Sequence, residues 1–84
     1  MFQVYVLKSM SDNFHYIGHS TNLDERIKSH NSGKVRSTKG RRPFELIYTE
    51  NYSSKGIAQK REYFLKSAAG NIWLRNKLME EGLW

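Results

Sequence analysis

The stretch FHYIGHSTNLDERIKSH, residues 14–30, decides the fold because it reads as a strand, a turn and a helix in direct succession. The aromatic and β-branched residues before Gly18 are typical of a strand, and Gly18 is expected to make the turn. The hydroxyl of Ser20 or Thr21 can cap the following helix, which we predict to run from about residue 21 to residue 31.

Three polar side chains of this stretch are expected to converge. Arg26 and His30 lie four residues apart on the predicted helix and therefore share one face. Tyr16 stands at the end of the incoming strand, so its phenol, a guanidinium and an imidazole would meet above that strand end. Such a group suits an anion, although each of these residue types, taken alone, is more often an ordinary structural residue.

A second tyrosine on the neighbouring strand favours the functional interpretation. Residues 2–7 and 13–18 predict the two strands of a hairpin, joined by a turn around residues 11–13. Tyr5 and Tyr16 then fall on adjacent strands.

With these residues in place, the chain resembles the GIY-YIG nuclease superfamily, specifically its short single-domain members, which are similar to the N-terminal domain of an excision-repair nuclease. The segment QVY at residues 3–5 corresponds to the first half of the motif and YIG at residues 16–18 to the second half. Arg26 and His30 match the helix positions that follow, and Glu62 matches the downstream glutamate. The QVY segment begins with glutamine where the family name has glycine.

The resemblance implies hydrolysis of DNA phosphodiester bonds with a single divalent metal ion, Mg²⁺ or Mn²⁺. The implied catalytic residues are Tyr5, Tyr16, Arg26, His30 and Glu62. In this scheme Glu62 binds the metal and Arg26 holds the scissile phosphate. Tyr5 is the general base, assisted by Tyr16 and His30. A single carboxylate suits one hard cation whose remaining ligands are waters and phosphate oxygens. His19, directly after the YIG segment, is expected to contact phosphate.

The bulk properties of the chain limit the possible classes of protein. Its 84 residues have room for one small domain, taken as residues 1–84. The absence of cysteine excludes disulfides and thiolate metal sites. The N-terminal residues lack the pattern of a signal peptide, and the sequence has no long apolar run, so we expect a cytoplasmic protein.

The charge of the chain favours a nucleic acid partner. Its net charge is +6, from 14 Lys and Arg against 8 Asp and Glu. Basic residues gather in one Gly- and Ser-rich segment that has no acidic residue, and these are Lys34, Arg36, Lys39, Arg41 and Arg42. We expect this loop to contact DNA phosphates with little sequence preference, its basic side chains being without acidic partners.

Pro43 marks the start of a third strand, residues 44–49, because proline at a strand entrance cannot donate to the ladder. If this strand pairs with the first, the sheet has the order 2-1-3 with all neighbours antiparallel. The predicted fold class is α+β, with elements in the order β-β-α-β-α-α.

Two helices are predicted for the remainder of the chain. The first begins at a cap, Ser53 or Ser54, and runs to about residue 69; the second follows an interruption at Gly70-Asn71 and ends at Gly82. The residues expected to be buried are Ile57, Ala58, Phe64, Leu65 and Ala68, then Ile72, Trp73, Leu78 and Met79.

Glu62 lies at the edge of the first helix's apolar stripe, where a carboxylate needs a cation. Apart from the resemblance, Glu62 would form a structural ion pair with a lysine or arginine, for example Arg61 or Arg26.

Three functions remain open from the sequence. The first is a metal-dependent DNA endonuclease, acting on branched or damaged structures in repair; the second is a non-catalytic nucleic-acid-binding module that keeps the nuclease fold. The weakest is an RNA-binding sheet, in which Tyr5 and Tyr16 would stack bases. Because family members usually take substrate recognition from an extra domain, a protein partner is expected to supply specificity to a monomer or weak homodimer.

Overall fold

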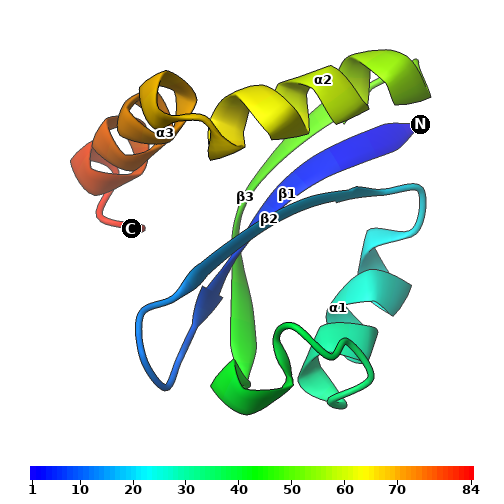
Figure 1. Cartoon of the computed structure of the whole chain (residues 1–84), viewed down its shortest axis with the longest axis vertical. Coiled ribbons are helices and arrows are strands. Elements are labelled where there is room, and N and C mark those ends of the chain that lie inside the picture. Colours follow the sequence, from blue (N-terminus) through cyan, green and yellow to red (C-terminus); the bar gives the residue numbers. More distant parts are fainter.

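A twisted three-stranded antiparallel sheet separates two helical layers in the computed structural model, which describes residues 1–84 (Figure 1). The elements in chain order are β1 (Phe2–Ser9), β2 (His15–Ser20), α1 (Leu23–Asn31), the 3₁₀ turn η1 (Lys39–Arg41), β3 (Phe44–Tyr52), α2 (Lys55–Lys66) and α3 (Ala68–Glu80). The strand order is β2-β1-β3, which confirms the predicted α+β class and the order 2-1-3. None of the helices has the length and apolar character needed to cross a membrane.

The central strand β1 is buried on both of its faces. Val4 and Val6 pack with residues of α2 and α3, whereas Tyr5 and Leu7 pack with the α1 side of the sheet. All four are fully buried, because successive side chains of a strand point to opposite faces and a helical layer covers each face. The Tyr5 phenol is therefore held in the interior of the protein.

The connection between β2 and α1 differs from the predicted turn. Gly18 lies inside β2 and pairs with Tyr5, and β2 continues to Ser20. The cap of α1 is Asn22, whose side chain accepts a hydrogen bond from the backbone N–H of Glu25 at 3.3 Å. The expected cap at Ser20 or Thr21 was wrong, because the extra residues of the strand move the start of the helix to Leu23.

The break between the last two helices lies at Ser67 and not at Gly70-Asn71. Ser67 ends α2, its backbone N–H donating to the carbonyl oxygens of Tyr63 and Phe64, and its side chain caps α3 by accepting from the N–H of Gly70. Gly70 lies within α3, where an added Cβ would be 1.8 Å from the Phe64 carbonyl oxygen. This glycine permits the close crossing of the two helices and does not interrupt the second one.

The buried face of α3 differs from the prediction because the helix break lies at Ser67. The buried residues Gly70, Leu74 and Leu78 follow one another at intervals of four, a spacing that starts afresh after Ser67. The expected core residues that are exposed are Ile57, Phe64, Ala68, Ile72, Trp73 and Met79. Ala58, Leu65 and Leu78 are buried, as expected.

Arg61 and Glu50 form an ion pair that joins α2 to β3. The Arg61 guanidinium donates to both Glu50 oxygen atoms, at 2.8 and 3.0 Å. Tyr48 and Tyr52 donate to the same carboxylate, at 2.5 and 2.7 Å. Burial acts to raise the pKa of Glu50, but these hydrogen bonds outweigh it and hold the pKa below its ordinary value of 4.5. Arg61 also lies 4.8 Å from the centre of the exposed Trp73 ring.

The depressed pKa of Glu50 predicts a loss of stability in acid. A carboxyl group whose pKa is lower in the folded chain stabilises the fold above its unfolded pKa, near 4.5, and loses this contribution as the pH falls through the folded value. Urea unfolding at about pH 7 and about pH 3 should show a smaller change in the free energy of unfolding for Glu50→Gln than for the wild type. The control Glu45→Gln, at an exposed position of the same strand without an ion pair, should behave as the wild type. Equal pH dependence in all three proteins would contradict the assignment.

Candidate active site

Tyr5 and His30 form a buried hydrogen-bonded pair between the sheet and α1. The Tyr5 phenol oxygen lies 3.2 Å from His30 Nε2, and His30 Nδ1 lies 2.8 Å from the hydroxyl of Thr38. All three residues are fully buried. His30 comes from the last turn of α1 and Thr38 from the loop that follows, so three separate segments meet at one imidazole.

Gly18 leaves the space that the Tyr5 phenol occupies. An added Cβ at Gly18 would lie 2.8 Å from the Tyr5 hydroxyl oxygen and 3.0 Å from the Tyr16 ring. The ring centres of Tyr5 and Tyr16 are 6.1 Å apart, and Tyr16 lies 4.6 Å from His30. The glycine of the YIG segment therefore accommodates two aromatic rings, and this is its structural role in place of the expected turn.

Arg26 lies beside the two tyrosines and places a positive charge at the phenols. Burial raises the pKa of Tyr5 to about 12, although the Arg26 guanidinium acts in the opposite direction. Burial, and then the charge of Arg26, lowers the pKa of His30 below its ordinary value. At neutral pH the site thus contains a neutral phenol and a neutral imidazole next to one fixed cation.

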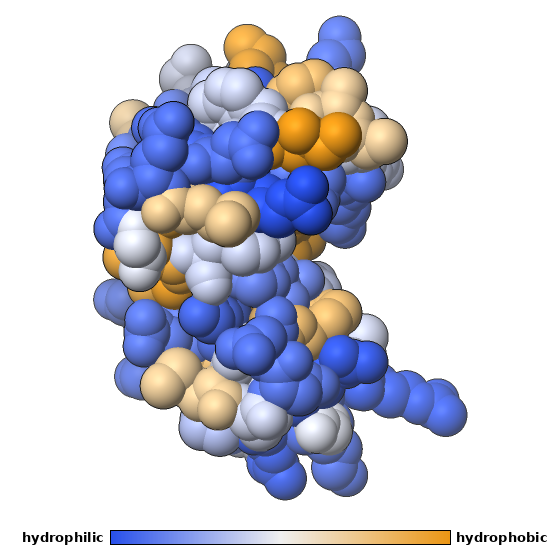
Figure 2. All heavy atoms as spheres, turned by 90° about the vertical axis from the view of Figure 1, so that its left-hand side faces the viewer, coloured by the Kyte–Doolittle hydropathy of each residue, from blue (hydrophilic) through white to orange (hydrophobic).

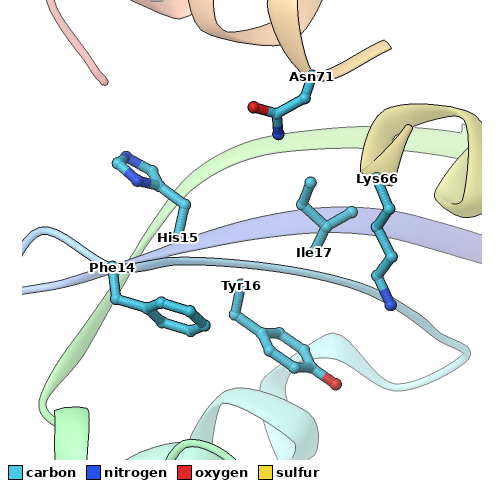
Figure 3. Close-up of a pocket in the computed structure, with 6 residues that line it drawn as sticks. All are labelled: Phe14, His15, Tyr16, Ile17, Lys66 and Asn71. Carbon is cyan, nitrogen blue, oxygen red and sulfur yellow. The ribbon is translucent and has the colours of Figure 1, made fainter. Parts of the chain in front are cut away.

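The surface near these residues has two hollows, one at the start of β2 and one at its end. One hollow, of about 300 Å³, is lined by Phe14, His15, Tyr16, Ile17, Lys66 and Asn71 (Figure 3). The other, of about 320 Å³, is lined by Phe2, His19, Ser20, Thr21, Arg26 and Lys55. Figure 2 shows the surface indented between an upper part with α2 and α3 and a lower part with α1. We call the two hollows together the β2 cleft.

Glu62 faces β2 from the α2 side. One of its carboxylate oxygens lies 2.6 Å from His19 Nδ1, and the other accepts from the Lys66 ammonium at 2.7 Å. Burial acts to raise the pKa of Glu62, but Lys66 and then His19 outweigh it and lower the pKa below its ordinary value. The carboxylate is therefore ionised, and its charge is near enough to contribute to the raised pKa of Tyr5. The expected ion pair with a lysine or arginine is confirmed, but the partner is Lys66 and neither Arg61 nor Arg26.

The donor set at Glu62 suits a metal ion with one protein ligand. No group of three His, Cys, Asp or Glu side chains could enclose a metal ion. Mg²⁺ is commonly held by one or two carboxylates with waters and substrate phosphates, and an ionised glutamate can serve in this way. A cation bound there would compete with Lys66 and His19 for the same oxygen atoms.

The basic loop, residues 34–42, has all five of its Lys and Arg side chains exposed. Arg41 is not free of acidic partners as expected, because its guanidinium pairs with Asp12 at 3.0 Å and lies 4.2 Å from the centre of the Phe14 ring. The β1–β2 turn packs against this loop and brings Asp12 to it. The other four basic residues of the loop form no ion pair.

The structure adds three residues to the neighbourhood of the expected site. Lys66 follows Glu62 by four residues, and this helical spacing could have indicated the ion pair. Asn71, expected only to interrupt the last helix, lines the β2 cleft opposite Tyr16 (Figure 3). Thr38 had no signal in the sequence, because a threonine within a polar loop is usually exposed.

The family of the chain follows from comparison with known proteins. The family model described as the GIY-YIG catalytic domain matches residues 1–76, and the chain belongs to this nuclease-type family. The chain is similar to UPF0213 protein SH2523 of Staphylococcus haemolyticus, with 48% identity over 93% of each chain. UPF0213 protein YazA of Bacillus subtilis is 46% identical over 74% of this chain and 63% of its own length.

A solved structure resembles the same fold. The solution NMR structure of the UPF0213 protein BH0048 from Bacillus halodurans matches with a TM-score of 0.55 and 39% identity, covering 90% of this chain and 84% of that one.

The space at Gly18 can be tested by filling it. Gly18→Ala should lower the free energy of unfolding by about 1–3 kcal/mol, because the new methyl group would displace the Tyr5 phenol. Gly56→Ala is the matched control: it lies in α2 with only the Ser54 hydroxyl nearby, at 3.7 Å, and should gain about 0.5–1 kcal/mol. Chemical denaturation measures both. A Gly18→Ala protein as stable as the wild type would show that the tyrosine pair is not tightly held.

Proposed function

We propose that this chain is a metal-dependent endonuclease that hydrolyses DNA phosphodiester bonds, with structured or damaged DNA as substrate in repair. The observation that carries the proposal is the buried hydrogen bond between Tyr5 and His30, which lies behind two residues that line the β2 cleft, Tyr16 and Arg26. Glu62 reaches the cleft through its contacts with His19 and Lys66, which line it. Membership of a nuclease-type family supports the same chemistry.

Hydrolysis of a phosphodiester requires removal of a proton from the attacking water and neutralisation of charge on the phosphoryl oxygens. Arg26 borders the cleft and would bind the scissile phosphate. Tyr5 would take the proton from water, with His30 as its hydrogen-bond partner and Tyr16 beside them. Because Tyr5 is fully buried, this step requires Tyr16 or Arg26 to move aside and admit the water. His19 lines the same hollow as Arg26 and would be a second phosphate contact.

Glu62 would hold the Mg²⁺ or Mn²⁺ ion of this reaction through its ionised carboxylate. When bound, such an ion lowers the pKa of coordinated water and stabilises negative charge on phosphate oxygens. Lys66, released from Glu62, would then face the cleft as an additional cation, with His19 beside it.

A non-catalytic nucleic-acid-binding module is the second candidate, and one observation favours it. Both oxygen atoms of Glu62 are already engaged, by His19 and Lys66, so the carboxylate has a complete structural role of its own. In that case the cleft and the basic loop would bind DNA without cutting it, and a protein partner would supply both specificity and any chemistry.

The basic loop is proposed to bind the DNA backbone through charge alone. Lys34→Ala and Lys39→Ala should each weaken binding of every DNA sequence alike and reduce the slope of log K against log salt by about one. The control Lys60→Ala removes an exposed, unpaired lysine of α2 and should change neither quantity. Fluorescence anisotropy over a salt series measures the effect, and a loss limited to one DNA sequence would contradict backbone contact.

The role of Glu62 separates the two candidate functions. Glu62→Gln should abolish metal-dependent cleavage while keeping the fold and nearly all DNA affinity, because an amide is a poor ligand for a hard cation. Its cost in stability should be only about 1 kcal/mol, since the stranded Lys66 side chain is 46% exposed and can be hydrated.

Glu50→Gln is the matched control for this experiment, because the two carboxylates are equally buried, at 12% and 13% side-chain exposure. Glu50 lies away from the β2 cleft, so its variant should be less stable but still cleave. Cleavage is measured on linear, nicked, flapped and branched DNA with and without Mg²⁺ or Mn²⁺. Metal-responsive cleavage by Glu62→Gln would remove Glu62 from the mechanism, and a wild type that binds but never cleaves would favour the non-catalytic module.

A further inference from the structure

The hydrogen bonds around His30 form a chain whose direction can be assigned. At its outer end, the Thr38 hydroxyl lies 3.3 Å from the Val35 carbonyl oxygen, which can only accept, so Thr38 donates to it. The Thr38 oxygen is then free to accept a hydrogen bond from His30 Nδ1, at 2.8 Å.

The hydrogen bond between Tyr5 and His30 indicates the same direction of donation. Tyr5 is fully buried and has one phenolic proton, and the side-chain atom within hydrogen-bond distance of its oxygen is His30 Nε2, at 3.2 Å. The Arg26 guanidinium also lies nearby. A guanidinium only donates, so the Tyr5 proton can go only to His30 Nε2. In the reverse direction, with the proton on Nε2, the phenolic proton would be buried without an acceptor, which is costly.

We propose that Thr38 is a positioning residue that holds the proton of neutral His30 on Nδ1, so that Nε2 accepts the phenolic proton of Tyr5. Both ends of the chain support this arrangement, and the two arguments use different atoms. The catalytic consequence rests on the proposed function, whereas the tautomer itself does not.

In the proposed hydrolysis this arrangement gives the water proton a complete route. As the water oxygen bonds to phosphorus, its proton passes to the Tyr5 oxygen and the original Tyr5 proton passes to His30 Nε2. The bond from phosphorus to the leaving oxygen breaks, and that oxygen takes a proton from solvent. His30 is then an imidazolium that donates from Nδ1 to Thr38 and returns its extra proton to solvent. The raised pKa of Tyr5 disfavours a free phenolate in the buried site. The lowered pKa of His30 disfavours the imidazolium as well, so His30 would hold the extra proton only briefly.

The basic loop, residues 34–42, supplies both Thr38, which contacts His30, and the basic side chains proposed to contact phosphate. Thr38 lies next to Lys39 and is held by its backbone and side chain to Val35. The position of the loop thereby determines the tautomer of His30, as well as the phosphate contacts proposed for its lysines.

The tautomer can be measured without any cleavage assay. The ¹⁵N chemical shifts of a histidine ring separate a protonated nitrogen from a bare one, and the signals of His30 are identified by their loss in His30→Gln. In the wild type we expect Nδ1 protonated and Nε2 bare. Thr38→Val, which removes the hydroxyl at nearly constant volume, should weaken this preference and shift the ¹⁵N signals, because Nδ1–H loses its acceptor while Tyr5 still donates to Nε2. Thr38→Ser should keep the wild-type shifts. Ser37→Ala, at the adjacent exposed position without a side-chain hydrogen bond, should leave both shifts unchanged.

Cleavage kinetics then test the consequence. Thr38→Val should lower kcat by roughly 10- to 100-fold with KM unchanged, the size of loss seen when the partner that orients a histidine is removed. Thr38→Ser should recover most of the rate.

A wild-type His30 with the proton on Nε2, or a Thr38→Val protein with unchanged ¹⁵N shifts, would overturn the inference. If Thr38→Val does not fold, the wild-type and Thr38→Ser shifts still decide it. A wild type with the expected tautomer but no cleavage would support the inference about Thr38 and contradict the proposed function.

Discussion

The complete burial of the Tyr5 phenol is the constraint on which the rest of the structure depends. A buried hydroxyl needs a partner, and His30 supplies one only because α1 closes over that face of the sheet. The opposite strand must give way to the ring, which requires Gly18 at the paired position. The Tyr5 hydroxyl in the central strand thus accounts for His30 in the helix and Gly18 in the neighbouring strand, and His30 in turn for Thr38 in the loop.

Two buried or half-buried carboxylates of α2 and β3 illustrate different solutions to the same problem. Glu50 is surrounded by four donors and lies away from the cleft, so its bonds serve to join α2 to the sheet. Glu62 has only Lys66 and His19, both of them partly exposed cleft neighbours. Glu62 can therefore exchange Lys66 and His19 for another cation at low cost. Glu50 cannot lose its partners without separating α2 from the sheet.

Periodicity and strand pairing were sufficient to predict the topology, because β1 alternates between two buried faces and the hairpin is local. The resemblance also identified Tyr5, Tyr16, Arg26 and His30 as neighbours, although their catalytic roles stay predictions. The position of Gly18 was misread, since a glycine that makes room for a distant side chain has the same appearance in the sequence as one that makes a turn. The exposed face of α3 was assigned wrongly because the break at Ser67 shifts the helical period, and a serine gives a weaker signal of a break than a glycine.

Ser67 has one more consequence, for the mechanics of the cleft. A single residue ends α2 and caps α3, and the close approach at Gly70 leaves no slack between the helices. The part of α2 and α3 that carries Glu62, Lys66 and Asn71 is therefore expected to move as one rigid unit. Because β2 is hydrogen-bonded to the central strand, the hollow that β2 shares with Lys66 and Asn71 has both of its sides fixed by the fold.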